Sequence, residues 1–448
     1  MTLFGTDGIR GRASRAPLVP EDLGRIAAIF ASQLIHGKSR EGARILIGND
    51  GRRSAGMIEA ALAASLTFEG CEVVDAGLLT TPVLAHETRL RGFDSGIMIS
   101  ASHNPAHDNG IKFFSRDGSK LPDEVEQAVE KAFEDGLRPR PAEKPGFHRR
   151  LADTGTAYLR FLQEEAFPGL SLKGIKILID CANGGGSILA PQVLEAFGAE
   201  VTSMNDRPNG DNINRGCGAL HPEELSREFE KDDYDLALCL DGDGDRSIFL
   251  DERGRVVHGD ALLTLLALHL GGTGALPGQC LAVTVMSNLG LKKVLSQAGL
   301  QVEETPVGDR AVVAAMRRKG LALGGEPSGH VIFGEEHNYT GDGIYTCLKL
   351  LGVMQETGKP LSELASCFSA FPQLLVNVEV KEKPPLEGIP EILETWKKIE
   401  EELGGDGRIV LRYSGTEPLC RVMAEGPTET IVENAVRRIV EVVQNKLA

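Results

Sequence analysis

The chain has 448 residues and a formal net charge of −16, with 42% hydrophobic and 25% charged residues. At roughly 150 residues per domain, this length predicts about three domains with several sizeable cores. The excess of acidic residues gives no support to a nucleic-acid or anionic-membrane partner, so an anionic substrate must be met by local arginines.

The N-terminus MTLFGTDGIRG lacks the charged and apolar regions of a signal peptide, and no uninterrupted apolar stretch is long enough to span a bilayer. The eight cysteines are scattered, with neither a CxxC pair nor zinc-ligand spacing. We therefore expect a cytoplasmic protein with reduced thiols.

Residues 1–150 are expected to form a first α/β domain. Arg10 and Arg12 lie close together in the glycine-rich opening FGTDGIRGRAS, where a phosphate contact and a solvated surface are equally good interpretations. A helical stripe from Pro20, a strand at 43–50, a helix at 58–66 and a strand at 71–78 follow. This alternation predicts a parallel sheet with right-handed crossovers.

The same domain contains GIMISASHNPAHDNGIKFF, an apolar strand that ends in a polar turn. Ligands of open α/β sheets gather beyond the carboxyl ends of strands. Ser102, beside the imidazole of His103 and followed by Lys112, is therefore well placed to be a nucleophile, although Ser-His-Asn-Pro is also good turn chemistry.

Residues 151–255 and 256–368 are expected to form two further α/β domains of related architecture. Helices are expected near Tyr158 to Phe167 and at 262–270. The strand YDLALCL of the second domain leads into DGDGDR, and the strand LALGG of the third leads into EPSGH. Each domain thus ends a buried strand in a polar, glycine-bearing loop.

The second-domain loop places Asp241, Asp243 and Asp245 at alternate positions, so three carboxylates can converge on one point. Two like charges about 4 Å apart repel by roughly 4 kcal/mol at an effective dielectric near 20, which indicates a bound cation or raised pKa values. Hard oxygen ligands with a phosphate nearby suit Mg²⁺. A phosphatase with a DxD nucleophile has the same local pattern and stays an alternative.

The third-domain loop combines Glu326, Ser328 and His330, which suit the hydroxyls of a sugar, and His330 could act as a general base. Residues 369–448 are expected to form a smaller α+β domain, with helices at 392–403 and 430–447. Its turn RYSGTEP, followed by Arg421, offers a guanidinium, hydroxyls and a backbone N–H to a phosphate that is held but not cleaved.

Together these loops resemble the α-D-phosphohexomutase superfamily and, within it, the phosphoglucosamine mutase family. The resemblance covers nearly the whole chain and rests on these motifs in order: FGTDGIRG, SASHNP, DCANG, PNGDNIN, DGDGDR, SNLGL, VGDR, GEPSGH, TGDG, FPQLLVNV and RYSGTEPLCRVM. It implies three related α/β domains with mixed sheets and a smaller α+β C-terminal domain around a central cleft.

The resemblance further implies an isomerase that interconverts glucosamine 6-phosphate and glucosamine 1-phosphate through a hexose bisphosphate and supplies UDP-N-acetylglucosamine and cell-wall precursor synthesis. It implies that Ser102 is carried as phosphoserine and that one Mg²⁺ per subunit is bound by Asp241, Asp243, Asp245 and an oxygen of that phosphate. It is compatible with a homodimer.

The remaining positions fall into two groups by their implied roles. Catalysis would involve Ser102, His103, Lys112, His330 and Arg10, with Lys112 and His330 at the positions proposed for proton transfer. Substrate binding would involve Arg246, Glu326, Ser328, Arg412, Ser414, Gly415, Thr416 and Arg421, the last five around the phosphate that is not transferred.

One departure concerns the substrate. Pro327 stands where amino-sugar members usually carry Asn or Gln, and proline has no N–H to donate. Phosphomannomutase/phosphoglucomutase activity is therefore the near alternative. A non-catalytic sugar-phosphate sensor is a third, from a different class.

Overall fold

The computed structural model describes residues 3–5, 7–34, 42–139, 142–414 and 418–448. The first domain has a six-stranded mixed sheet in the order β1-β5-β4-β2-β3-β6, in which β4 and β5 are antiparallel and β2 is parallel to both β3 and β4. Its elements are β1 (Ile9–Arg12), α1 (Pro20–Leu34), β2 (Arg44–Asn49), α2 (Ala55–Phe68), β3 (Glu72–Leu78), α3 (Thr81–Leu90), β4 (Ser95–Ile99), β5 (Asp108–Ser115), α4 (Asp123–Glu134) and β6 (His148–Arg150).

The second domain has a five-stranded mixed sheet in the order β11-β10-β9-β7-β8. Its elements are α5 (Thr156–Phe161), β7 (Lys176–Asp180), α6 (Leu189–Ala196), β8 (Glu200–Met204), β9 (Leu236–Leu240), β10 (Ser247–Leu250) and β11 (Val256–Val257). The helix expected near Tyr158 to Phe167 is α-helical only to Phe161 and continues as a π-helical turn at Leu162–Ala166. The repeating pattern of side chains cannot distinguish these two helical pitches over one turn.

The third domain has a four-stranded mixed sheet in the order β13-β12-β14-β15. Its elements are α7 (Gly259–Gly272), β12 (Cys280–Thr284), α8 (Leu289–Gln297), β13 (Gln301–Thr305), α9 (Asp309–Lys319), β14 (Leu323–Gly325), β15 (Val331–Phe333), α10 (Gly343–Thr357) and α11 (Leu361–Ala365). One continuous apolar cluster joins buried residues of all three domains, from Leu46 and Tyr158 to Leu361, so these domains pack as one body.

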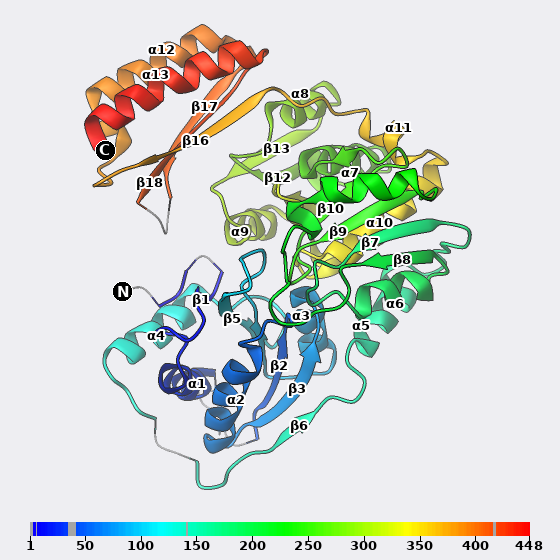
Figure 1. The fold of residues 1–448 in the computed structure, drawn as a ribbon, viewed down its shortest axis with the longest axis vertical. Coiled ribbons are helices and arrows are strands. Elements are labelled where there is room, and N and C mark those ends of the chain that lie inside the picture. The colour runs from blue at the N-terminus through cyan, green and yellow to red at the C-terminus, as the bar shows by residue number, and fades with distance from the viewer. Residues whose placement is uncertain (1–2, 6, 35–41, 140–141, 415–417) are drawn as a thin grey trace.

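The C-terminal domain has an antiparallel sheet in the order β16-β18-β17, and α12 and α13 lie side by side over one face of it (Figure 1). Its elements are β16 (Gln373–Glu379), α12 (Pro390–Leu403), β17 (Arg408–Tyr413), β18 (Leu419–Glu425) and α13 (Glu429–Leu447). This domain has its own apolar core. The predicted fold class, three α/β domains with mixed sheets and a smaller C-terminal α+β domain, is confirmed.

Candidate active site

The loop between β4 and β5 presents Ser102 in a constrained conformation. Ser102 is 1% exposed and has a φ of 52°, in the left-handed region that non-glycine residues rarely occupy. Its N–H donates to Ser100 Oγ at 2.8 Å, and its carbonyl accepts from Asn214 Nδ2 at 2.9 Å. Such strain persists only where neighbouring groups hold it, so the orientation of the Ser102 hydroxyl is set by this network.

The main support of the loop is Arg52, whose importance the sequence did not reveal. Arg52 is 2% exposed and forms an ion pair with Asp50 at 2.8 Å. Its guanidinium donates to the carbonyls of four loop residues, Ser102, Asn104, Pro105 and Asp108. Five donors in a planar fork can serve this many acceptors, which a lysine cannot do.

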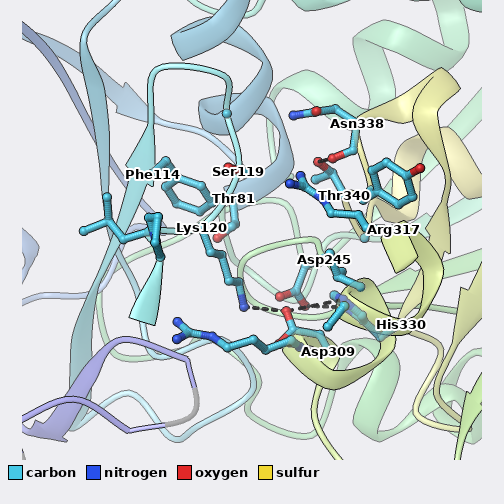
Figure 2. Close-up of a pocket in the computed structure, with 18 of the residues that line it drawn as sticks. Thr81, Phe114, Ser119, Lys120, Asp245, Asp309, Arg317, His330, Asn338 and Thr340 are labelled. Carbon is cyan, nitrogen blue, oxygen red and sulfur yellow. Dashed lines mark hydrogen bonds and ion pairs between the residues drawn. The ribbon is translucent and has the colours of Figure 1, made fainter. Parts of the chain in front are cut away.

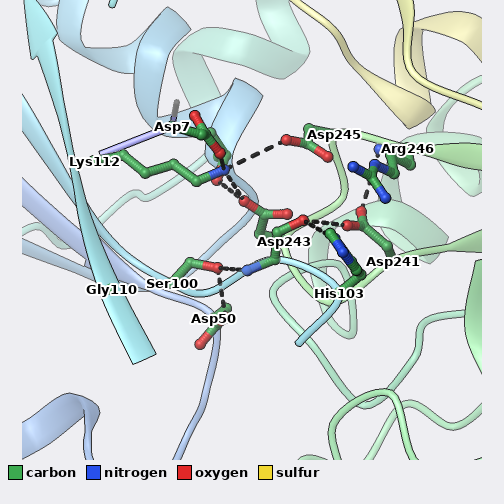
Figure 3. A network of polar contacts seen from close by, with 12 residues as sticks. Asp7, Asp50, Ser100, His103, Gly110, Lys112, Asp241, Asp243, Asp245 and Arg246 are labelled. Atoms are coloured by element: carbon green, nitrogen blue, oxygen red, sulfur yellow. Dashed lines mark hydrogen bonds and ion pairs between the residues drawn. The ribbon is translucent and has the colours of Figure 1, made fainter. Parts of the chain in front are cut away.

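The loop after β9, residues 241–246, which we call the metal-type loop, contacts this serine. Figure 3 shows its three aspartates together with His103 and Lys112. Ser102 Oγ donates to Asp241 Oδ2 at 2.8 Å. One carboxylate oxygen from each of Asp241, Asp243 and Asp245 lies within 4.8 Å of the other two, and all three residues are buried. Gly242 allows this approach, since a Cβ there would lie 2.7 Å from the carbonyl oxygen of Ser102.

The electrostatics of the three aspartates fit a cation. Burial and the charges of Asp245 and Asp243 raise the pKa of Asp241 well above its usual value. Asp243 Oδ1 is buried, and no donor among the described residues reaches it. A divalent ion with a preference for oxygen would stabilise all three carboxylates as anions, which is the donor set that Mg²⁺ favours.

Lys112 on β5 contacts two aspartates of the metal-type loop. Its Nζ is 2.8 Å from Asp243 Oδ2 and 3.4 Å from Asp245 Oδ2. Burial alone would lower the pKa of Lys112, but Asp243, Asp7 and Asp245 hold it well above the usual value. Lys112 is therefore an ammonium ion in this arrangement and can stabilise negative charge.

Asp7 links the N-terminal segment to the same centre, and the sequence alone did not single it out. It lies 2.8 Å from Lys112 Nζ and forms ion pairs with Arg10 and Lys120. Although burial acts in the opposite direction, these cations hold the pKa of Asp7 well below its usual range. Through Asp7 the structure brings Arg10 beside Lys112 and the aspartates.

His103 and His330 differ in protonation, although both are near the aspartates. Burial and the charges of Arg246 and Arg10 lower the pKa of His103 to about 4, so its imidazole is neutral, with Nδ1 3.3 Å from Ser102 Oγ. Burial would also lower the pKa of His330, but its interaction with Asp245 raises it to about 9. His330 is therefore protonated at neutral pH in this arrangement.

His330 also forms one wall of a cavity of about 340 Å³ between the first and third domains (Figure 2). Its Nδ1 is 3.7 Å from Asp245 Oδ1, and its Nε2 is 3.8 Å from Asp309 Oδ2. Asp309 forms an ion pair with Lys120, which also contacts Asp7. Asp309 and Lys120 are therefore further members of the charged network. Asp309 lies in the VGDR motif, but sequence patterns indicated no role for either residue.

The loop after β14 carries the predicted sugar-binding pair. Glu326 Oε1 accepts from the N–H of Gly308 at 3.1 Å, and the hydroxyl oxygen of Ser328 is buried without a hydrogen-bond partner among the described residues. Arg246 follows the aspartates, and its N–H donates to Asp241 Oδ1 at 3.2 Å. Although burial opposes it, the charges of Asp245, Asp241 and Glu326 raise the pKa of Arg246, so these groups share one electrostatic environment.

In the C-terminal domain, Arg412 and Arg421 are cross-strand partners on β17 and β18. With Ser414 they line a cavity of about 830 Å³ whose other wall is built from residues of the third domain such as Lys292 and Glu304. Burial and the charge of Arg421 lower the pKa of Arg412, an arrangement that an anion would stabilise. Gly415 and Thr416 lie outside the described residues.

No helix within the described ranges combines the length and the apolar character that crossing a bilayer needs.

Sequence profiles of known families match the chain in four consecutive parts. They are Phosphoglucomutase/phosphomannomutase alpha/beta/alpha domain I at residues 1–139, domain II at 156–254, domain III at 258–371 and the C-terminal domain at 375–442. Together they cover most of the chain.

Solved structures with the same fold include a phosphoglucomutase/phosphomannomutase family protein from Burkholderia thailandensis, with a TM-score of 0.82, 23% identity and coverage of 100% of this chain and 98% of that one. A second is the Aspergillus fumigatus N-acetylphosphoglucosamine mutase in complex with GlcNAc-6P and magnesium, with a TM-score of 0.68, 20% identity and coverage of 99% and 95%. At these identities the likeness establishes the fold.

Curated relatives are much more similar in sequence. The phosphoglucosamine mutase of Syntrophotalea carbinolica is 47% identical, over 99% of this chain and 98% of the relative. That of Geobacter sp. strain M21 is 46% identical, with the same coverage. The chain therefore belongs to the phosphoglucosamine mutase family of the phosphoglucomutase/phosphomannomutase superfamily, and it is an isomerase.

Proposed function

We propose that Ser102 carries the transferred phosphoryl group and that the enzyme uses it to interconvert glucosamine 6-phosphate and glucosamine 1-phosphate. The observation that supports this most directly is the 2.8 Å contact between Ser102 Oγ and Asp241 within a buried group of three aspartates. A hydroxyl at this position can receive and return a phosphoryl group beside a cation site.

One Mg²⁺ per subunit would be held by Asp241, Asp243, Asp245 and an oxygen of the phosphate on Ser102. When bound, it would neutralise charge on the phosphoryl oxygens during transfer. Lys112 and Arg10 lie next to the same loop and would contribute further positive charge. The protein thus supplies mainly positioning and charge, which dominate the catalysis of phosphoryl transfer.

In the first half-reaction, the bond between phosphorus and Ser102 Oγ breaks while a bond forms to the C1 oxygen of glucosamine 6-phosphate. The C1 hydroxyl loses its proton to a base, and Ser102 Oγ regains a proton. We assign the proton transfers to Lys112 and His330, the positions that the family resemblance implies. His330, with a pKa of about 9, is suited to donate a proton, and the neutral imidazole of His103 lies 3.3 Å from Ser102 Oγ.

The product of this step is a hexose bisphosphate, which must turn end over end. Ser102 Oγ then attacks the 6-phosphate, the proton of Ser102 leaves, and the C6 oxygen gains a proton. Arg246, Glu326 and Ser328 would contact the sugar in both orientations. Arg412, Ser414, Gly415, Thr416 and Arg421 would hold whichever phosphate is not being transferred.

The substrate assignment follows the relatives, which are named phosphoglucosamine mutases. The product would supply the synthesis of UDP-N-acetylglucosamine and cell-wall precursors in the cytoplasm. Pro327 favours a second candidate, glucose or mannose phosphate, because it offers no N–H beside the sugar.

Two measurements test the proposal. Intact-protein mass spectrometry with peptide mapping should find phosphate on Ser102, and coupled assays primed with hexose bisphosphate should give the highest kcat/KM with glucosamine 6-phosphate. Ser102→Ala should abolish both the phosphate and the activity.

The alternatives predict different outcomes. Retained activity in Ser102→Ala would contradict the mechanism and favour a DxD phosphatase. A higher kcat/KM with glucose or mannose phosphate would contradict only the substrate assignment. Ligand binding without phosphate or turnover would indicate a sensor.

A further inference from the structure

A buried polar cluster lies where the first three domains meet, and none of its residues takes part in the mechanism above. The junction cluster, as we call it, consists of His86 on α3, Tyr158 on α5, and His337 and Asp342 between β15 and α10. These four side chains are at most 1% exposed. Each domain therefore contributes at least one polar residue to a site that solvent does not reach.

Hydrogen bonds to the carboxylate of Asp342 organise the cluster. Its Oδ2 accepts from Tyr158 Oη at 2.6 Å and lies 2.9 Å from His337 Nε2. Its Oδ1 accepts the N–H groups of Ile344 and Tyr345 at 3.0 and 3.1 Å, which caps the first turn of α10. Both carboxylate oxygens are thus fully used, and the start of α10 is tied to the second domain.

The imidazole of His86 stacks on that of His337, with ring centroids 4.3 Å apart. Burial, together with the nearby His337 and Arg89, lowers the pKa of His86 well below its usual value. Arg89 Nη2 lies 3.3 Å from His86 Nδ1. Because a guanidinium can only donate, Nδ1 is the acceptor, and the His86 ring is neutral. Stacking of neutral His86 therefore connects α3 to the segment that precedes α10.

The first residues of both helices, α3 and α10, are hydrogen-bonded to the metal-type loop. At the start of α3, the N–H of Thr81 donates to the carbonyl of Asp243 at 2.8 Å, and the Thr81 hydroxyl also contacts the Asp243 carboxylate. At the start of α10, the N–H of Gly343 donates to the carbonyl of Gly244 at 3.0 Å. The aspartate loop is thus held from two sides by helix starts that the junction cluster joins.

We infer that the junction cluster positions the metal-type loop, by holding the first turns of α3 and α10 in the relative placement that keeps the three aspartates converged. This inference depends on the proposed metal site. The residues of the junction cluster are positioning residues, because they act through Thr81 and Gly343 and do not touch the substrate. Groups that bond directly to metal ligands commonly change metal affinity by 10- to 100-fold, and Thr81, which the cluster helps to hold, bonds to Asp243.

The same residues could instead be taken as a second metal site, since one ligand atom from each of His86, His337 and Asp342 lies within 4.8 Å of the others. The hydrogen bonding argues against it. Asp342 Oδ2 already accepts from Tyr158, and the stacked imidazole rings direct their in-plane lone pairs along separate planes. The geometry suits a hydrogen-bonded contact that holds the three domains together.

The test compares two buried tyrosines. Tyr158→Phe removes the hydroxyl bonded to Asp342, whereas Tyr345→Phe keeps the ring that stacks on His337 and leaves the Asp342 bonds intact. We expect calorimetric titration of the dephosphorylated enzyme with Mn²⁺ to give a Kd about tenfold weaker for Tyr158→Phe and within about twofold of wild type for Tyr345→Phe. Amide exchange of residues 241–246 should increase only in Tyr158→Phe.

Should Tyr158→Phe fail to fold, His337→Gln and His337→Ala replace it, because Gln keeps a donor for Asp342 and should bind Mn²⁺ more tightly than Ala. Equal Kd values for wild type and Tyr158→Phe, or equal weakening in both tyrosine variants, would overturn the inference. So would zinc that co-purifies with wild type and is lost in His337→Gln. Failure of wild type to bind one Mn²⁺, or unchanged binding in Asp241→Asn, would instead overturn the proposed metal site.

Discussion

The hydroxyl of Ser102 donates to the carboxylate of Asp241 at 2.8 Å, although the two residues are 139 positions apart and belong to different domains. The hydrogen bond between the two loops can form only when the first two domains pack together. The carboxylate that receives the bond is also the one whose pKa is raised by burial and by its two neighbours. The contact thus joins the proposed nucleophile to the least favourable charge of the metal-type loop.

Asp241→Asn should therefore stabilise the metal-free protein while removing its response to metal. The amide can still accept a bond from Ser102, and it removes one of three converging charges. We expect the free energy of unfolding without metal to rise by about 1 to 2 kcal/mol at neutral pH. Calorimetry with and without Mg²⁺ checks this, and Ser102→Ala, which keeps all three carboxylates, should retain a Mg²⁺-dependent rise in Tm. A fall in metal-free stability would contradict the electrostatic account.

Arg52→Lys should reduce activity by about 100-fold, because a misplacement of about 1 Å at a reacting group has an effect of that size. Lysine keeps the charge but cannot serve four loop carbonyls and Asp50 together. Arg53→Lys is the matched control, since the adjacent Arg53 is exposed and pairs with Asp211. Its stability should stay within about 0.5 kcal/mol of wild type. Equal loss of kcat in both variants would contradict the role given to Arg52.

These two arginines also show what the sequence could and could not predict. Apolar strands followed by polar, glycine-bearing turns predicted where Ser102 and Asp241 lie, because strand ends and ligand sites coincide in α/β sheets. NDGRRS contains no local signal that separates Arg52 from Arg53, since burial of the first depends on a loop about 50 residues further along the chain. Local periodicity predicted α/β domains with parallel sheets, whereas the observed sheets also contain antiparallel strands, as the family resemblance implied. The support of the site depends on long-range contacts.

The charged network around Asp7 likewise depends on long-range contacts. Lys120 and Asp309 belong to different domains and meet only when these domains pack. Their individual positions, in a hairpin and at the start of a helix, are typical of solvated residues. The motifs FGTDGIRG and VGDR contain Asp7 and Asp309, but the resemblance implied no role for either residue, and Lys120 lies outside the motifs.

Gly341→Ala should impair activity without a large loss of stability. A methyl group at Gly341 would overlap the imidazole of His330, which is 5% exposed and held between Asp245 and Asp309. Displacing this ring should lower kcat about 100-fold. Gly352→Ala, in the middle of α10 with no atom within 4 Å of the added carbon, is the control and should gain about 0.5 to 1 kcal/mol of stability. Wild-type kcat in Gly341→Ala would contradict a role for the position of His330.

Asp260→Asn should change how stability depends on pH. Asp260, in the first turn of α7, accepts from the N–H of Asn288 at 2.8 Å, and burial raises its pKa from 3.8 to about 6. Because the folded pKa exceeds the unfolded one, Asp260 binds more protons in the native state in this window, and its contribution to wild-type stability must fall as pH rises from about 4 to about 6.

A shift of this size corresponds to about 3 kcal/mol. Asp260→Asn keeps an acceptor for Asn288 but cannot ionise, so its stability relative to wild type should increase by up to about 3 kcal/mol between about pH 4 and pH 8. Calorimetric unfolding across this range checks the prediction. Asp406→Asn, an exposed residue paired with Lys293, should show a difference from wild type of at most about 0.5 kcal/mol throughout. A relative stability of Asp260→Asn that does not change with pH would show that burial does not raise the pKa of Asp260.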